Sequence, residues 1–351
     1  MILPTSLSLY FIMSFADILG QDRPKQVLKK ALQNGHIPNA YLFYGQESIG
    51  KKFTAIEVAK ALNCKVYGPK DCCDQCSSCR KIEGNTHPDF FILEPEKNSP
   101  SAREAIIKID AVRELQKKLA YLPYEGEVKV AIINNVEHMN PQAANSFLKT
   151  LEEPPSKTLI ILVACNPYQI LPTIVSRCQG IRFQPLSTEF IRKIIAEHLI
   201  NENGEAQPEE LELRSHRAMG QVARAVKEDL LEVSQYREEL IDLIGSVSFE
   251  CMDKVFIWTK TWAKHTDSIQ LILDEMMNLL RDTAVIKIDR KSNAIFNKDL
   301  TRQLESLAQQ KSLPALLAMF EAVQNTKSAL KSNANAQLSL ENMLLNFCEA
   351  A

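Results

Sequence analysis

The sequence has little glycine, no surplus of charge of either sign and no long apolar run. Only 11 of its 351 residues are glycine, roughly half of the usual share, which favours helices over tight turns. Lysine and arginine number 41 against 43 acidic residues, a formal net charge of −2. This excludes a strongly basic protein that holds nucleic acid through its overall field, and it excludes an acidic tail protein. Because no segment can span a bilayer, we expect a cytoplasmic protein that has no contact with membranes.

The length predicts two or three domains, at about 150 residues per domain. Residues 1–12 are apolar, but no lysine or arginine precedes them and no small-residue cleavage site follows. A signal peptide is therefore the weaker interpretation. Met13 opens a sequence that is typical of a folded domain. We expect residues 1–12 to be a disordered or misassigned extension.

Short apolar runs alternate with helical patterns up to Pro185. The runs fall at 40–45, 89–95, 128–133, 158–165 and 180–186, and helical spacing is found at 16–35, 53–64, 107–123, 141–155 and 170–178. Because the runs are apolar throughout, they predict a parallel sheet covered on both faces, an α/β domain. From Ser187 onward only helical periodicity is found, which predicts an all-α region with a bundle core.

A phosphate-loop pattern follows the first apolar run. Gly45, Gly50 and Lys51 match G-x-x-x-x-G-K between a predicted strand and a predicted helix, where backbone N–H groups and the lysine hold phosphates. The next residue should be Ser or Thr to bind Mg²⁺, but it is Lys52. A later strand ends in asparagines at 134–135 instead of the acidic residue that helps to hold Mg²⁺. We expect no hydrolysis of ATP by this chain alone. Nucleotide binding without turnover stays open, as does a loop kept only for the fold.

Five of the nine cysteines lie between Cys64 and Cys79. Cys64, Cys73, Cys76 and Cys79 are separated by eight, two and two residues, and four thiolates so placed predict a closed, structural zinc site. A ferredoxin-type cluster would need another cysteine three residues after Cys79, followed by proline, and neither is present. Disulfides do not suit the expected compartment. Spacing alone leaves open whether Cys72 replaces Cys73.

Together these features resemble the bacterial clamp-loader subunits, which are AAA+ proteins of the DNA polymerase III holoenzyme. The resemblance is carried by the phosphate loop, the cysteine module, HPD at 87–89, NSFLKTLEEPP at 145–155 and SRC at 176–178. It covers residues 14–351. It implies an AAA+ P-loop domain at 13–185 with a zinc module at 64–79, a helical lid domain at 186–232, and a helical collar domain for oligomerisation at 233–351.

Three positions depart from the motor subunits of that family, called tau and gamma. Those subunits keep Ser or Thr after the loop lysine and an Asp-Glu pair on the later strand, where this chain has Lys52 and residues 134–135. Ala223 aligns with the arginine of their sensor-2 motif, although Arg224 stands one position away. The departures indicate the delta-prime branch, a non-catalytic stator subunit. A tau/gamma-like ATP-hydrolysing motor and a zinc-dependent nucleic-acid-binding regulator are the alternatives.

The resemblance also implies a role for Arg177 of the SRC triplet. Each active site of an AAA+ ring lies at a subunit interface, and Arg177 would be the arginine finger donated in trans to a neighbouring ATPase subunit. Otherwise Arg177 caps a helix or pairs with a nearby carboxylate. The implied partners are the tau/gamma and delta subunits in a hetero-pentameric ring, with the sliding clamp and primed DNA reached through that complex. Structural Zn²⁺ is the expected cofactor, and ATP with Mg²⁺ is not expected to be hydrolysed.

Overall fold

The structure is a computed structural model. It describes residues 15, 18–68, 71–97, 105–203, 211–212, 214–215, 218, 220–226, 236–263, 269–290, 295–332 and 334–350. The expected extension at 1–12 lies outside the described residues. The chain divides into two compact units, Met1–Asn201 with Gly220–Ala223, and Glu202–Met219 with Arg224–Ala351. The finer division into lid and collar domains stays a prediction.

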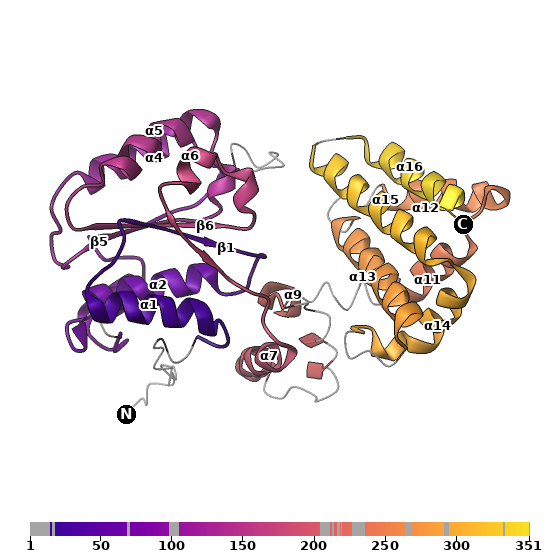
Figure 1. Cartoon of the computed structure of the whole chain (residues 1–351), viewed down its shortest axis with the longest axis horizontal. Coiled ribbons are helices and arrows are strands. Elements are labelled where there is room, and N and C mark those ends of the chain that lie inside the picture. Colours follow the sequence, from indigo (N-terminus) through magenta and orange to yellow (C-terminus); the bar gives the residue numbers. More distant parts are fainter. Residues whose placement is uncertain are drawn as a thin grey trace, which may run out of the picture. The chain divides into compact units, whose positions relative to one another are not determined.

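A five-stranded parallel sheet forms the centre of the first unit (Figure 1). Its strands are β1 (Ala40–Tyr44), β2 (Phe90–Leu93), β5 (Lys129–Ile133), β6 (Thr158–Ala164) and β7 (Gln179–Arg182), in the order β2-β5-β6-β1-β7. Every neighbouring pair is parallel. Each strand lies in one of the predicted apolar runs or overlaps it, so the predicted α/β class is confirmed.

Helices cover both faces of this sheet, which explains why the strands are apolar throughout. Helices α1 (Asp22–Asn34) and α2 (Lys51–Asn63) lie on one face, and α4 (Ile109–Leu119), α5 (Pro141–Glu152) and α6 (Pro172–Val175) on the other (Figure 1). In β1, Tyr41 and Phe43 pack into the core of the first face and Leu42 into that of the second. Alternate residues of a strand point to opposite faces, so each side of the sheet has its own core.

Three local features differ from the sequence prediction. The helix expected over 107–123 ends at Leu119, and Tyr121 and Leu122 are exposed beyond it. An antiparallel pair, β3 (Glu96–Lys97) with β4 (Ala105–Ile106), was not predicted, because strands of two residues show no periodicity. A short helix, α3 (Ser77–Glu83), also went unpredicted among the cysteines.

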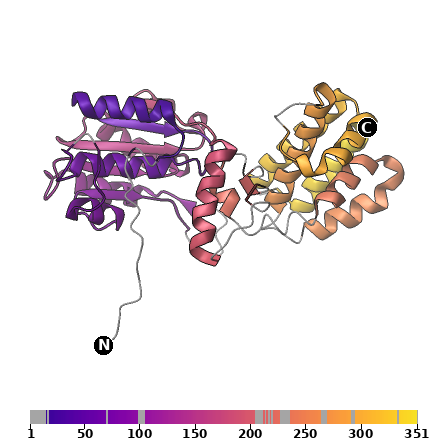
Figure 2. The same cartoon turned by 90° about the horizontal axis from the view of Figure 1, so that it is seen from below.

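From Thr188 onward the described residues form helices joined by turns and contain no strand, as the periodicity predicts. After α7 (Thr188–Asn203) and α9 (Val222–Val226) come α11 (Arg237–Ser246), α12 (Met252–Trp262), α13 (Ile269–Ile288), α14 (Thr301–Gln310), α15 (Leu313–Lys331) and α16 (Ala336–Ala350) (Figures 1 and 2). This part of the chain also contains the short 3-10 turns η4 (Phe249–Cys251) and η5 (Lys298–Leu300), while η2 (Val136–His138) and η3 (Pro167–Gln169) lie in the first unit. Leu273, Met276 and Leu280 of α13 pack in one core with Leu316 and Phe347. None of the helices in the described residues is long and apolar enough to cross a membrane.

Candidate functional site

The phosphate loop runs from Gly45 to the start of α2. Gly45 has φ +145°, and a Cβ there would lie 2.5 Å from the carbonyl oxygen of Phe183. Gly50 has φ +91° and is the N-cap of α2. Both φ values lie in the region that favours glycine, which explains why glycine stands at both positions of the motif. The loop lies between the end of β1 and the N-terminus of α2.

Lys51 folds back onto the loop that precedes it. Its buried ammonium donates to the carbonyl oxygen of Gly45 at 2.7 Å and to that of Gln46. Burial lowers the pKa of Lys51, against the opposing effect of charges that include Glu137 of η2. One oxygen of Glu137 accepts from the backbone N–H of Cys165 at 2.8 Å, so this carboxylate lies at the carboxyl end of β6.

Other protein donors hold two more carbonyl groups of the loop. Gln21 Nε2 donates to the carbonyl of Ile49 at 3.1 Å. The backbone N–H of Val222 donates to the carbonyl of Ser48 at 2.8 Å. These donors come from distant parts of the same unit, so the fold itself helps to hold the loop.

The positions expected to hold Mg²⁺ carry a different interaction. Lys52 Nζ and Asn134 Nδ2 both donate to Glu94 Oε1, each at 2.9 Å. The bond from Lys52 is the main cause that lowers the pKa of Glu94. Two donors thus stand where a metal ion needs oxygen ligands, and the carboxylate that receives them, Glu94, is already paired. The residues present do not fit a Mg²⁺ site of the P-loop type.

Four cysteines converge at the far end of α2, where Cys64 is the C-cap. The sulfur atoms of Cys64, Cys73, Cys76 and Cys79 all lie within 4.8 Å of one another. Backbone N–H groups point at three of them: Tyr67 to Cys64 at 3.5 Å, Cys76 to Cys73 at 3.3 Å and Cys79 to Cys76 at 3.4 Å. Such bonds favour thiolates, and they lower the pKa of Cys76 to about 6 although burial opposes this. This donor set fits a tetrahedral metal ion with no open position for catalysis.

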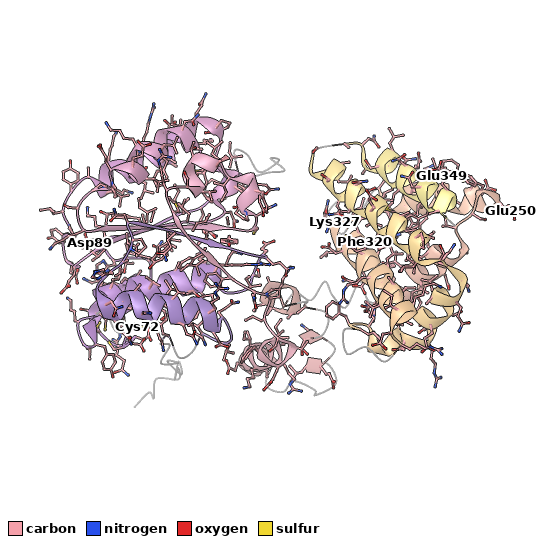
Figure 3. The ribbon with its side chains drawn as sticks, in the orientation of Figure 1. Cys72, Asp89, Glu250, Phe320, Lys327 and Glu349 are labelled. Atoms are coloured by element: carbon pink, nitrogen blue, oxygen red, sulfur yellow. The ribbon has the colours of Figure 1, made fainter. Side chains whose placement is uncertain are left out.

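Cys72, which is labelled in Figure 3, is not a member of this four-sulfur group. Its sulfur is 3.0 Å from Glu57 Oε2, and burial raises its pKa strongly. The buried ammonium of Lys60 pairs with Glu57 at 3.0 Å and with Asp74 at 2.9 Å. Lys60 therefore supplies the positive charge that these carboxylates need. The geometry answers the question that spacing left open, because Cys73 and not Cys72 belongs to the four-sulfur group.

Arg177 lies just after α6, and its side chain is about one-third exposed. It pairs with Glu152 at 2.5 Å and donates to the carbonyl of Thr173 at 2.9 Å. Glu152 is the first glutamate of the LEEPP string. Within the single chain Arg177 thus pairs with a carboxylate and caps the short helix, and the ion pair leaves the guanidinium reachable from solvent.

The candidate residues from the sequence therefore lie in three separate places, namely the phosphate loop, the cysteine cluster and the ion pair of Arg177 with Glu152. The phosphate loop and the cysteine cluster lie at opposite ends of the 13-residue α2, about 20 Å apart at 1.5 Å per residue. Glu94 and Glu152 are the important residues that sequence reasoning missed. Glu94 lies in no motif, and no spacing rule connects Glu152 of the NSFLKTLEEPP string with Arg177, so no local signal identified either partner.

Two family models match the chain. The first, described as DNA polymerase III, delta subunit, matches residues 20–187, and the second, described as DNA polymerase III, delta subunit, C terminal, matches residues 232–349. DNA polymerase III subunit delta' of Bacillus subtilis is 29% identical over 333 residues, 93% of this chain and 95% of that protein. Subunit delta' of Pseudomonas aeruginosa is 39% identical over 140 residues, 40% of this chain and 41% of that protein. Subunit tau of Salmonella typhimurium is 33% identical over 214 residues, 61% of this chain but 32% of that protein.

Solved structures resemble the chain more distantly. A DNA polymerase III gamma subunit-related protein of Thermotoga maritima shares 18% identity, covering 92% of this chain and 98% of its own, with a TM-score of 0.36. The DNA clamp loader delta protein of Bacillus subtilis shares 13% identity, covering 92% of this chain and 99% of its own, with a TM-score of 0.33. TM-scores of this size carry no argument about the fold. The family to which this chain belongs is therefore argued from the sequence comparisons alone.

Proposed function

The chain belongs to the DNA polymerase III delta-subunit family, and we propose that it is a clamp-loader subunit of the delta-prime type, a stator without ATPase activity of its own. The observation that carries this proposal is the contact of Lys52 and Asn134 with Glu94. A positive charge and an amide take the places of the groups that hold Mg²⁺ in a P-loop ATPase. Full-length similarity to a subunit named delta' supports the same branch.

The alternative is a tau/gamma-like motor subunit, which the similarity to subunit tau keeps open. A motor needs Mg²⁺ to neutralise the charge that develops on the transferred phosphoryl group. Lys52 is a donor and cannot ligate Mg²⁺. The purified chain, titrated with ATP and Mg²⁺, is expected to show no turnover above background. Measurable turnover that an inactive phosphate-loop variant lacks would favour the motor.

Arg177 is proposed as the arginine finger for a neighbouring ATPase subunit. Its ion pair with Glu152 is partly exposed on both sides, with 34% and 48% of the side chains accessible. Such pairs contribute about 0–1 kcal/mol, so a phosphate of the neighbour can take the guanidinium at little cost. A finger of this kind accelerates phosphoryl transfer by about 10³–10⁵.

The partners that follow are the tau/gamma and delta subunits in a hetero-pentameric ring, which would load the sliding clamp onto primed DNA. The helical lid at 186–232 and the collar at 233–351 would supply much of the contact between subunits. The cysteine cluster would hold one structural Zn²⁺, which ties the Cys64 end of α2 to α3.

The test is reconstitution of the loader with Arg177→Ala. Assembly is expected to be unchanged, while the DNA- and clamp-stimulated ATPase falls by the share of the site next to this subunit, because that site alone loses its finger. Arg113→Ala, an exposed arginine on α4 with a 4.0 Å ion pair, is the matched control. Unchanged ATPase in the assembled Arg177→Ala loader would rule out the finger. Failure of the wild-type chain to join tau/gamma and delta would rule out the stator.

A further inference from the structure

Two hollows in the second unit share the exposed residues Asp242 and Ser246 of α11. One hollow, of about 220 Å³, lies between α11 and α12, and the other, of about 340 Å³, lies between α11 and α14. They adjoin each other across α11, and we call them together the α11 groove. Helices α11, α12 and α14 pack in the same hydrophobic core (Figure 1), so the groove lies on one packed body.

The groove is acidic. Glu239 and Asp242 line it, both are exposed, and neither has an ion-pair partner among the described residues. Glu238 and Glu239 stand in the first turn of α11, where the helix dipole favours acidic residues. Asp242 stands further along the helix, beyond the reach of that effect. The dipole therefore does not account for the carboxylate that both hollows share.

No described cation balances these carboxylates. Arg237, the one basic residue of α11, is buried, and its guanidinium pairs with Glu275 at 2.9 Å. Lys260 of α12, Arg302 of α14 and Lys311 just after α14 line neither hollow. The groove therefore attracts a cation from outside the chain, and it repels nucleic acid and other anions.

Apolar side chains form the walls of the hollow between α11 and α12. They are Leu243, Val247, Val255 and Trp258. The side chain of Trp258 is almost fully buried, and its Nε1 has no hydrogen-bond partner among the described residues. A buried donor without a partner is costly and rare in folded proteins. An indole N–H in this state, on a ring that lines a hollow, calls for an acceptor from a ligand.

The second hollow adds neutral hydrogen-bonding groups. Gln303, Ser306 and Gln310 of α14 stand at i, i+3 and i+7, so they lie on one face of the helix, and all three line the hollow. No described residue bonds to these three side chains. Amide and hydroxyl groups can bond to the N–H and C=O groups of a peptide. This side of the groove can therefore hold main chain.

We propose that the α11 groove binds a segment of a partner protein through a lysine or arginine of that segment. The cationic head would pair with Glu239 and Asp242. The apolar stem would lie along Val247 and Val255, and a carbonyl oxygen of the segment would accept the N–H of Trp258. A basic residue within a polypeptide brings these three groups together, namely a cation, an apolar stem and a neighbouring acceptor.

The test is a titration of the full chain with the peptide acetyl-Ala-Leu-Arg-Leu-Ala-amide, followed by tryptophan emission. The chain has two tryptophans, of which Trp258 lines the groove and Trp262 does not. A saturable change in emission is expected. The same peptide with citrulline in place of arginine keeps the shape without the charge, and it is expected to bind about 3- to 20-fold more weakly.

Carboxylate variants test the assignment on the protein side. Asp242→Asn is expected to raise Kd for the arginine peptide about 2- to 5-fold, and Asp242→Asn combined with Glu239→Gln about 3- to 20-fold. Asp253→Asn is the matched control and is expected to bind like the parent chain. Asp253 of α12 is exposed and has no partner among the described residues, but it lines neither hollow. The melting temperature of each variant shows that it is folded.

Several results would overturn the proposal. They are no saturable change with the arginine peptide, equal affinity for the citrulline peptide, or equal Kd values for Asp242→Asn and Asp253→Asn. If sedimentation shows that the parent chain self-associates and Asp242→Asn does not, the groove is a contact between copies of the chain and the proposal is wrong. The titration needs no other clamp-loader subunit, so its failure is distinguishable from failure of the stator proposal.

Discussion

Replacing Asp89 by asparagine tests how the HPD motif supports the first unit. In the native chain Oδ1 accepts the N–H of Tyr124, and Oδ2 accepts those of Glu125 and Gly126. An asparagine has one acceptor oxygen and one NH₂ group at this place. If the oxygen keeps the pair of donors, the NH₂ group faces the N–H of Tyr124, and that bond is lost.

The cost can be worked out from these three bonds. A buried donor left without a partner costs about 1–3 kcal/mol. The two remaining bonds lose the charge that made them roughly twice as strong as neutral ones. Together these effects amount to about 2–4 kcal/mol of stability. For a unit of about 200 residues this lowers Tm by roughly 5–15 °C.

Thermal and urea unfolding of the purified chain measure this change at pH 7. Because the folded pKa of Asp89 is lowered, its contribution is present above the unfolded pKa and is lost as pH falls through the folded value. The difference between parent and Asp89→Asn is therefore expected to shrink below about pH 4. Asp110→Asn, an exposed carboxylate on α4, is the control. If Asp89→Asn lowers the free energy of unfolding by less than about 0.5 kcal/mol at pH 7, the three bonds to Asp89 do not stabilise the chain as argued.

Two further predictions follow from the site. Cys79→Ser is expected to lower the zinc content from one ion per chain to none, because a closed four-sulfur site loses a ligand. Cys72→Ser, outside the cluster, is expected to keep the ion, and elemental analysis of both decides; equal zinc in the two variants would contradict the assignment. Gly45→Ala is expected to destabilise the chain by about 1–3 kcal/mol, since its φ of +145° and the carbonyl of Phe183 leave no room for a Cβ. Gly84→Ala, where a Cβ would meet no atom nearer than 3.4 Å, is the control in the same unfolding assay, and equal losses would contradict the strain argument.

Local patterns predicted elements wherever burial was complete. β5 and β6 are buried along their whole length, and their apolar runs mark them almost to the residue. Prediction was wrong where an apolar residue is exposed. Tyr121 and Leu122 continue the apolar pattern of α4, but the helix ends at Leu119 and both side chains face solvent. Periodicity reports which residues are apolar and not whether the chain buries them.

The sequence by itself determined the α/β and all-α halves, the positions of the phosphate loop and the cysteine module, and the family. Each depends on short spacings and residue types that lie close together along the chain. Only the tertiary structure decided that Cys73 rather than Cys72 joins the sulfur cluster, that Glu94 receives Lys52, and that Glu152 receives Arg177. The partners in these two ion pairs stand 42 and 25 residues apart. No helical or strand period relates positions so distant, and only the packing of the sheet and its helices brings them into contact.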